Sequence, residues 1–196
     1  MSAGSFAAAS AISISDASCQ TTSYKSGVAG FQFFGMGFST DAEGGATESL
    51  FIGGGDALMQ GSPSLGRMTA ANLTPTSLGT LALASFPELS GTSKGEIYAY
   101  FPGPFQPRVQ LLNKANGATA KEWKLTAPSG TVRSYAFAHW GGQFYIFQTT
   151  EDQVGALTSR VARMNPADGS LTTVVASSPY QVVGAGVSTC APLILG

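Results

Sequence analysis

The chain has 196 residues, of which 11% are charged and 43% are hydrophobic, and its 10 Lys and Arg against 11 Asp and Glu leave a net charge of −1. This length suffices for one domain, or one array of repeats, with an ordinary core. The balanced charge excludes nucleic acid as an expected partner. We expect no membrane span, because no window approaches the roughly 18 uninterrupted apolar residues of a membrane helix.

The N-terminal residues 1–10 are small and weakly apolar, without the basic residues or the apolar stretch of a signal peptide. We expect them to be disordered or artificially added, and residues 11–196 to form a single domain. Few charges, 25 glycines and many Ser and Thr residues favour a secreted or cell-surface location. Cys19 and Cys190 lie near opposite ends of the chain, which fits one terminal disulfide or two free thiols and excludes a zinc site made of cysteines alone.

Two stretches far apart in the chain are alike: residues 31–41 read FQFFGMGFSTD and residues 180–190 read YQVVGAGVSTC. They are 149 residues apart, which is three units of about 50 residues. Five positions are identical, namely Gln32 and Gln181, Gly35 and Gly184, Gly37 and Gly186, Ser39 and Ser188, and Thr40 and Thr189. We therefore interpret both stretches as the first strand of a repeated unit.

The other strands follow in chain order at similar spacing. Second strands are predicted at LFI (50–52), IYAYF (97–101) and FYIF (144–147), third strands with their turns at 65–71, 109–117 and 161–169, and fourth strands at 76–81, 121–125 and 171–175. The last two turns share the pattern Asn-x-x-x-Gly, in which glycine permits a positive φ. No stretch has sustained helical periodicity, so we expect almost no helix.

Four short antiparallel strands per unit are typical of a propeller blade. We predict an all-β, β-propeller-like array of about four units, at 30–81, 82–125, 134–175, and 180–190 joined with 11–25. The last unit is completed by the N-terminal segment, which would bring Cys19 close to Cys190, or by a second chain in a homo-oligomer that closes the ring.

The repeat resembles that of secreted bacterial β-propeller proteins of uncharacterised type, on the motifs AFAHWGGQFYIF at 136–147 and VGAGVSTC at 183–190. In a propeller the innermost strands line a channel. The candidate ligand-binding residues at its mouth are Ser39, Thr40, Ser90, Thr92, Trp140, Ser188 and Thr189, and the candidate catalytic residues are His139, Glu88, Asp41 and Cys190. The paired glycines predict close packing of strands around a narrow axis.

His139 is the single histidine of the chain, so it is the natural general base or metal ligand; the alternative is an interior histidine that serves packing. Glu88 lies among apolar neighbours, and we expect burial to raise its pKa. A cluster of His139 and Cys190 with Asp41 or Glu88 would suit a thiol nucleophile or a calcium or zinc ion.

Three functions follow from these residues. The first is an extracellular or surface recognition module that binds a carbohydrate, peptide or small molecule at the channel mouth. The second is a hydrolase of esters, lactones or phosphoesters that uses His139 with Glu88 or Asp41 and a metal ion or Cys190, and calcium or zinc is expected under this reading alone. The third is a structural fragment of a larger propeller.

Overall fold

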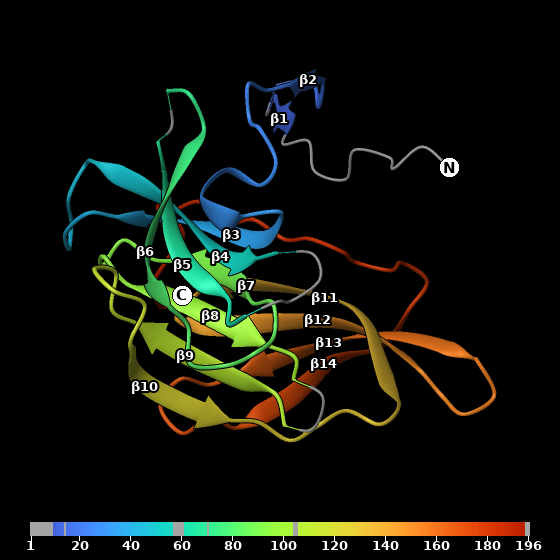
Figure 1. Ribbon diagram of the computed structural model, residues 1–196. Coiled ribbons are helices and arrows are strands. Elements are labelled where there is room, and N and C mark those ends of the chain that lie inside the picture. Colours follow the sequence, from blue (N-terminus) through green and yellow to red (C-terminus); the bar gives the residue numbers. More distant parts are fainter. Residues whose placement is uncertain (1–9, 14, 57–60, 70, 104–105, 195–196) are drawn as a thin grey trace, which may run out of the picture.

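A computed structural model describes residues 10–13, 15–56, 61–69, 71–103 and 106–194 (Figure 1). The described residues are almost entirely β, with fourteen strands and a single 3-10 turn, Val28–Gly30. They contain no helix that is long and apolar enough to cross a membrane. The predicted disordered segment, residues 1–10, lies outside the described residues except for Ser10.

Three four-stranded antiparallel sheets follow one another along the chain, each with its strands paired in chain order. The first sheet consists of β3 (Phe33–Thr40), β4 (Glu48–Gly55), β5 (Ser64–Thr69) and β6 (Thr74–Thr80). The second consists of β7 (Glu88–Gly91), β8 (Ile97–Phe101), β9 (Arg108–Leu112) and β10 (Thr119–Lys124). The third consists of β11 (Thr131–Trp140), β12 (Gln143–Glu151), β13 (Leu157–Met164) and β14 (Leu171–Ser178). The all-β prediction of blade-like units is confirmed.

The turn between the third and fourth strands is the same in the second and third sheets, as predicted. In both, the N–H of the glycine (Gly117 or Gly169) donates to the carbonyl of the asparagine four residues earlier, at 2.8 Å. Both glycines have a φ of 75°. In the first sheet Leu73 occupies this position with a φ of 52°, so the third copy of the turn is present without its glycine.

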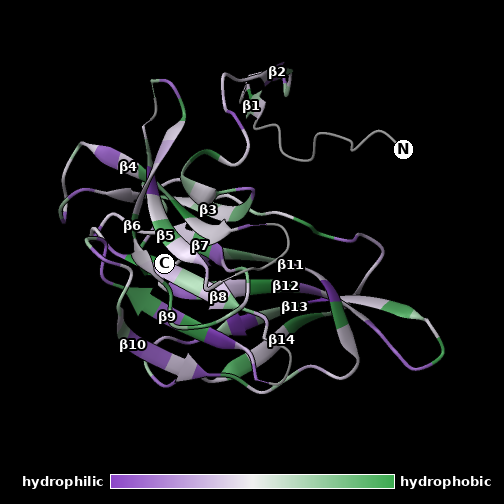
Figure 2. Ribbon diagram, viewed as in Figure 1, coloured by the Kyte–Doolittle hydropathy of each residue, from purple (hydrophilic) through white to green (hydrophobic). Residues whose placement is uncertain are grey.

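The first strands of the three sheets lie side by side, with β7 between β3 and β11. Apolar side chains fill the space between neighbouring sheets. Phe51, Leu65 and Leu89 belong to the core between the first and second sheets, and Tyr100, Phe137 and Phe144 to the core between the second and third. The edge strand β10 is mostly hydrophilic in Figure 2, which protects its unpaired edge from other strands.

The structure differs from the prediction at the fourth unit. The short strands β1 (Ser10–Ile12) and β2 (Cys19–Thr21) pair with each other, and residues 179–194 form no strand. No fourth sheet therefore joins the two ends of the chain within the described residues, and the three sheets do not close into a ring. Completion by a second chain stays a prediction.

The C-terminal residues 180–192, called here the bridging segment, connect the third sheet to the first. Gln181 Nε2 donates to Ser134 Oγ in β11 at 3.2 Å, and the carbonyl of Pro192 accepts from the N–H of Gly141 at 2.9 Å. Between these anchors, the Thr189 hydroxyl donates to Glu48 at the start of β4. The bridging segment thus contacts both the third and the first sheet through these hydrogen bonds. The sequence had predicted a fourth innermost strand at residues 180–190.

Candidate functional site

The predicted polar residues of the innermost strands do gather at one end of these strands, but they are engaged with one another. Thr40 Oγ1 donates to the Thr92 carbonyl at 3.3 Å, which links β3 to the end of the second sheet's first hairpin. Ser90 Oγ accepts from the N–H of His139 at 2.9 Å, which links β7 to β11. Ser39, Thr40, Ser90, Thr92 and His139 are all buried. The Thr40 and Ser90 side chains therefore link neighbouring sheets, whereas those of Ser39 and Thr92 bond within their own sheets.

On the bridging segment, Thr189 is buried against Glu48, whereas Ser188 Oγ accepts from the N–H of Cys190 at 3.1 Å in a local turn. Cys190 and Cys19 are both exposed free thiols. Of the two alternatives that the sequence allowed, the structure therefore has the two free thiols and not the disulfide. The reason is topological, because Cys19 pairs within the β1–β2 hairpin instead of joining the bridging segment.

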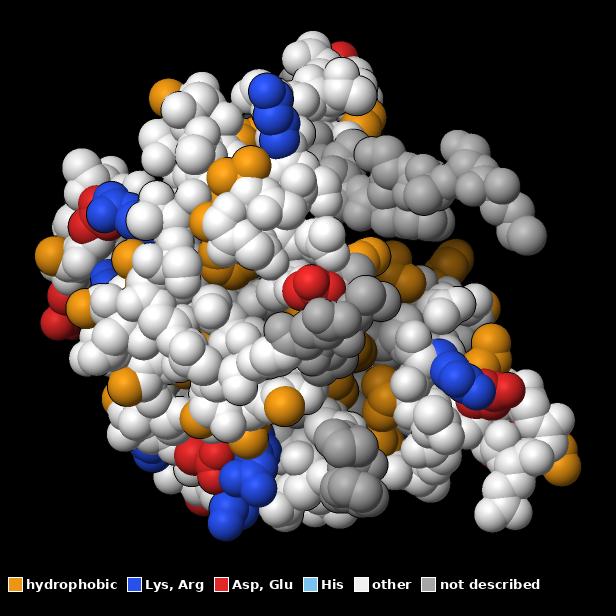
Figure 3. Space-filling model, viewed as in Figure 1, with side chains coloured by type: hydrophobic (Ala, Val, Ile, Leu, Met, Phe, Trp, Pro, Cys, Tyr) orange, Lys and Arg blue, Asp and Glu red, His pale blue; other side chains and the backbone are white. Residues whose placement is uncertain are grey.

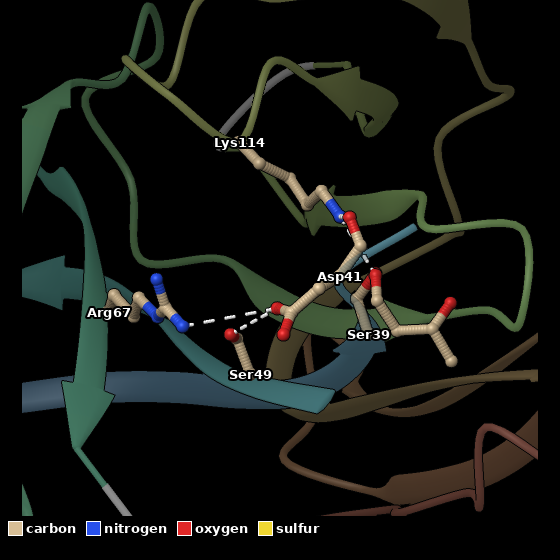
Figure 4. A network of polar contacts seen from close by, with 6 residues as sticks. Ser39, Asp41, Ser49, Arg67 and Lys114 are labelled. Atoms are coloured by element: carbon tan, nitrogen blue, oxygen red, sulfur yellow. Dashed lines mark hydrogen bonds and ion pairs between the residues drawn. The ribbon is translucent and has the colours of Figure 1, made fainter. Parts of the chain in front are cut away.

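Asp41 lies in a network at the outer end of β3 (Figure 4). Its Oδ1 accepts from Ser49 Oγ at 2.5 Å and lies 3.9 Å from Arg67 Nη2. The hydrogen bonds from Ser49 and Thr47, more than the charge of Arg67, lower the pKa of Asp41. Lys114 Nζ reaches the carbonyls of Thr40 and Asp41 at 2.8 and 3.1 Å. This network fastens the β3–β4 turn to the second sheet.

Glu88 begins β7 and is half-buried, with β3 close beside it. A methyl group on Gly35 would lie 3.1 Å from Glu88 Oε2. Burial raises the pKa of Glu88 from 4.5 to about 7, as expected from the sequence. Tyr135, whose hydroxyl donates to the Phe86 carbonyl at 2.8 Å, has its pKa raised to about 12 by burial and, second, by the charge of Glu88.

His139 is 5% exposed, and its ring lies edge-on against Phe144 with 5.3 Å between ring centroids. Burial lowers the pKa of His139, so the imidazole is neutral at pH 7. Trp140, the next residue, is 51% exposed. The packing of His139 supports the interior-histidine alternative.

The four candidate catalytic residues thus have four separate surroundings. His139 contacts Phe144, Asp41 contacts Ser49, Glu88 faces β3, and Cys190 is in an exposed turn. Across the part of the chain that the structure describes, no group of three or more His, Cys, Asp or Glu side chains is placed to hold a metal ion. The structure does not assemble the cluster that the sequence suggested.

An apolar cavity of about 300 Å³ lies between β3, β7 and the bridging segment, and we call it the axial cavity. Its side-chain walls are Met36, Phe38, Leu50, Leu89 and Val187. Ser90 also lines it and is the one polar side chain among the described lining residues. Because Ser90 Oγ already accepts from His139 N–H, its hydroxyl proton is left to donate to a ligand.

Sequence reasoning had placed Ser90 at a binding site but had missed the apolar walls. The available signal was the run FQFFGMGF, because its exposed Met36 and Phe38 are large apolar residues on an innermost strand. The exposed fractions of Met36 and Phe38 are 44% and 43%. On the face seen in Figure 3, charged side chains lie in small scattered groups.

No family model matches this chain, and no curated protein matches it. Among solved structures, 49 chains match. One of them comes from a study titled "Structural and Mechanistic Analysis of Two Prolyl Endopeptidases: Role of Inter-Domain Dynamics in Catalysis and Specificity", with a TM-score of 0.43 and 14% identity. The match covers 90% of this chain and 26% of that chain, so this chain spans about a quarter of its length.

Proposed function

We propose that the protein is an extracellular or surface recognition module that binds a ligand in the axial cavity. The observation that carries this proposal is the combination of apolar walls with a single hydroxyl donor, Ser90, beside the innermost strands β3 and β7. Ligand sites are mostly apolar with a few polar groups that fix orientation. This chemistry favours a small molecule or peptide side chain with an apolar body and one hydrogen-bond acceptor over a carbohydrate.

The bridging segment contributes one wall of this cavity through residues 185–187. Neither Gly184 nor Gly186 has a heavy atom within 4 Å of where a Cβ would stand. The Cβ positions of both glycines therefore face open space, in contrast to those of Gly35 and Gly37 in β3. A ligand that fills the cavity gains contacts with the segment that the free protein lacks.

Acetophenone and ethylbenzene provide a direct test, because they share a ring and differ in the carbonyl acceptor. In an NMR titration we expect both to shift the amide signals of Ser90, Gly91 and residues 185–187, with acetophenone binding several-fold more tightly. Ser90→Ala removes the hydroxyl and should reduce acetophenone to the affinity of ethylbenzene. Ser49→Ala, which removes another buried serine hydroxyl away from the cavity, is the matched control and should change neither affinity.

Equal affinities for the two compounds in the unaltered protein would contradict the role of Ser90. Saturable shifts at another place, with none around the axial cavity, would contradict the proposed site.

A hydrolase is the second candidate function, and Glu88 is the observation that favours it. A carboxyl group with a pKa near 7 can both donate and accept protons at neutral pH. On a panel of chromogenic esters and phosphoesters, this candidate requires turnover that disappears in Glu88→Gln and persists in Glu43→Gln, a change at an exposed carboxylate. Turnover that persists in Glu88→Gln and disappears in His139→Ala would indicate that His139, and not Glu88, is the acid or base.

A further inference from the structure

Arg160 occupies an unusual position in β13. It pairs directly with Gln148 of β12, and strand alternation places it on the same face as Ala162 and Met164, which are buried. That face packs against the second sheet through Phe144, Ile146 and Met164, and Gln148 and Thr150 are the buried polar residues of β12 beside Arg160. A guanidinium on a core-facing register position is seldom found without a partner for its charge.

The partners of Arg160 do not account for its donors. Its Nη2 donates to Gln148 Oε1 at 3.3 Å, while its Nε is buried and has no hydrogen-bond partner. The ion pairs among the described residues are Arg67–Asp41, Arg108–Glu122 and Arg133–Glu151, so none of them neutralises Arg160. Buried N–H groups nearly always have an acceptor. Nε itself is closed off from solvent, so an acceptor from outside the chain would be met by the terminal nitrogens of the guanidinium.

A cavity of about 270 Å³ opens beside Arg160 between the second and third sheets, and we call it the inter-sheet cavity. Leu125, Ile146 and Leu171 give it apolar walls, and Thr126 and Thr173 add hydroxyl groups. Its inner end is ordered by hydrogen bonding: Gln148 Nε2 donates to the Tyr100 hydroxyl at 2.6 Å. That bond turns Gln148 Oε1 toward Arg160 and so fixes the guanidinium at the cavity wall.

We propose that the inter-sheet cavity binds a small organic carboxylate. The planar guanidinium matches a carboxylate, which accepts two parallel N–H bonds. The apolar walls match a hydrocarbon or aromatic body attached to that carboxylate. One guanidinium balances one negative charge, so a monoanion fits this site better than a strongly hydrated phosphate dianion. This site is independent of the axial cavity and of the function proposed there.

Benzoate is a suitable probe, with benzamide as its uncharged counterpart of the same shape and inorganic phosphate as an anion without an apolar body. In an NMR titration of the full chain, we expect benzoate to shift the Arg160 Nε–H signal and the amides of residues 146–148 and 171–173. Benzamide and phosphate should bind at least about tenfold more weakly. Arg160→Gln should weaken benzoate binding by at least about tenfold.

Arg163→Gln is the matched control. It removes the same charge from the same strand, but residue 163 lies on the opposite face of the sheet from residue 160, so benzoate binding should not change. Arg160→Lys keeps the charge and loses the planar pair of N–H donors. It should weaken benzoate binding less than Arg160→Gln does. If Arg160→Gln fails to fold, the lysine variant and the contrast between benzoate and benzamide in the unaltered protein still decide the matter.

Three results would overturn the proposal: no saturable benzoate shift, equal affinities for benzoate and benzamide, or unchanged benzoate affinity in a folded Arg160→Gln. Phosphate binding as tight as that of benzoate would also contradict it, because it would show a general anion site without recognition of the apolar body.

Discussion

Strand β3 and residues 180–190 have nearly the same sequence pattern but different structures. β3 pairs with β4 along its whole length, and its glycines lie against β7. A Cβ on Gly35 would stand 2.3 Å from the Pro87 carbonyl oxygen, and one on Gly37 would stand 3.0 Å from that of Leu89. The matching Gly184 and Gly186 have nothing within 4 Å of that position, and their segment forms no strand.

The comparison shows that the repeat pattern defines a potential innermost strand, while its neighbours decide whether the strand forms. β4 follows β3 after the loop of residues 41–47 and supplies partners for its backbone groups. Nothing in the described chain does the same for residues 182–189, because β1 and β2 pair with each other. Backbone N–H and C=O groups that lack a paired strand form hydrogen bonds with water or side chains. The bridging segment is held in place by the side-chain hydrogen bonds of Gln181 and Thr189.

The largest expected effect comes from exchanging one glycine of each pair for alanine. Gly35→Ala should lower the free energy of unfolding by about 3 kcal/mol, because the new methyl group meets backbone atoms of β7 that cannot move independently. Gly184→Ala should change it by no more than about 0.5 kcal/mol, because the added group meets open space. Urea unfolding followed by circular dichroism measures both. Equal losses would show that the two stretches have equivalent surroundings, against the structure.

A second test uses Glu88, which is half-buried where β3 approaches β7. Its pKa in the folded protein is about 7, above the ordinary 4.5, so the folded state favours the protonated form. The resulting stability is fully present below about pH 4.5 and is lost as the pH rises through 7. Glu88→Gln should remove this loss and raise the free energy of unfolding at pH 8 by about 2 kcal/mol relative to the unaltered protein.

Urea unfolding at pH values from 5 to 8 measures the effect of Glu88→Gln. Glu43→Gln, at an exposed carboxylate, is the control and should leave the pH dependence unchanged. If the free energy of unfolding changed with pH equally in the Glu88→Gln variant and in the unaltered protein, Glu88 would be solvated and β3 would not cover it.

Thr40 and Thr189 occupy equivalent positions in the two stretches and give a third test. Thr40→Val removes the hydrogen bond between the first and second sheets and should cost about 1 kcal/mol of global stability. Thr189→Val removes the bond to Glu48, and we expect the loss to be local. Hydrogen exchange should then quicken at the Ala191 and Gly141 amides, which donate to Ser188 and Pro192, while the amides of β12 keep their protection. Faster exchange throughout the third sheet in Thr189→Val would contradict this expectation.

Much of the fold was predictable because the strands repeat with local signals. The turns with Gly117 and Gly169 were recognisable by their glycines, whereas the turn predicted in the first unit lacks this signal, because Leu73 adopts the positive φ there. Whether residues 180–190 form a strand could not be predicted from their pattern, since strand formation depends on a neighbouring strand that supplies hydrogen bonds.

The candidate site was predictable in position but not in chemistry. Sequence alignment of the innermost strands brought Ser90 and His139 to neighbouring strands, and the structure places them in contact. It could not show that the Thr40 hydroxyl donates to the backbone, or that the Ser90 oxygen accepts from it, because these partners lie in other sheets. Arg160 was missed because its inward direction depends on the register of β13 with β12.

The smallest expected change in the free energy of unfolding comes from replacing either of the two cysteines. Cys19 and Cys190 are both exposed as free thiols, so a thiol reagent such as 5,5′-dithiobis(2-nitrobenzoate) should titrate two thiols in the folded, unreduced protein. Cys190→Ser should leave the free energy of unfolding unchanged within about 0.5 kcal/mol, as for an exposed residue. Cys19→Ser is the matched variant and should behave alike. Absence of titratable thiols before reduction, with two after it, would restore the disulfide; β2 would then lie beside the bridging segment, and the contrast between that segment and β3 would lose its topological basis.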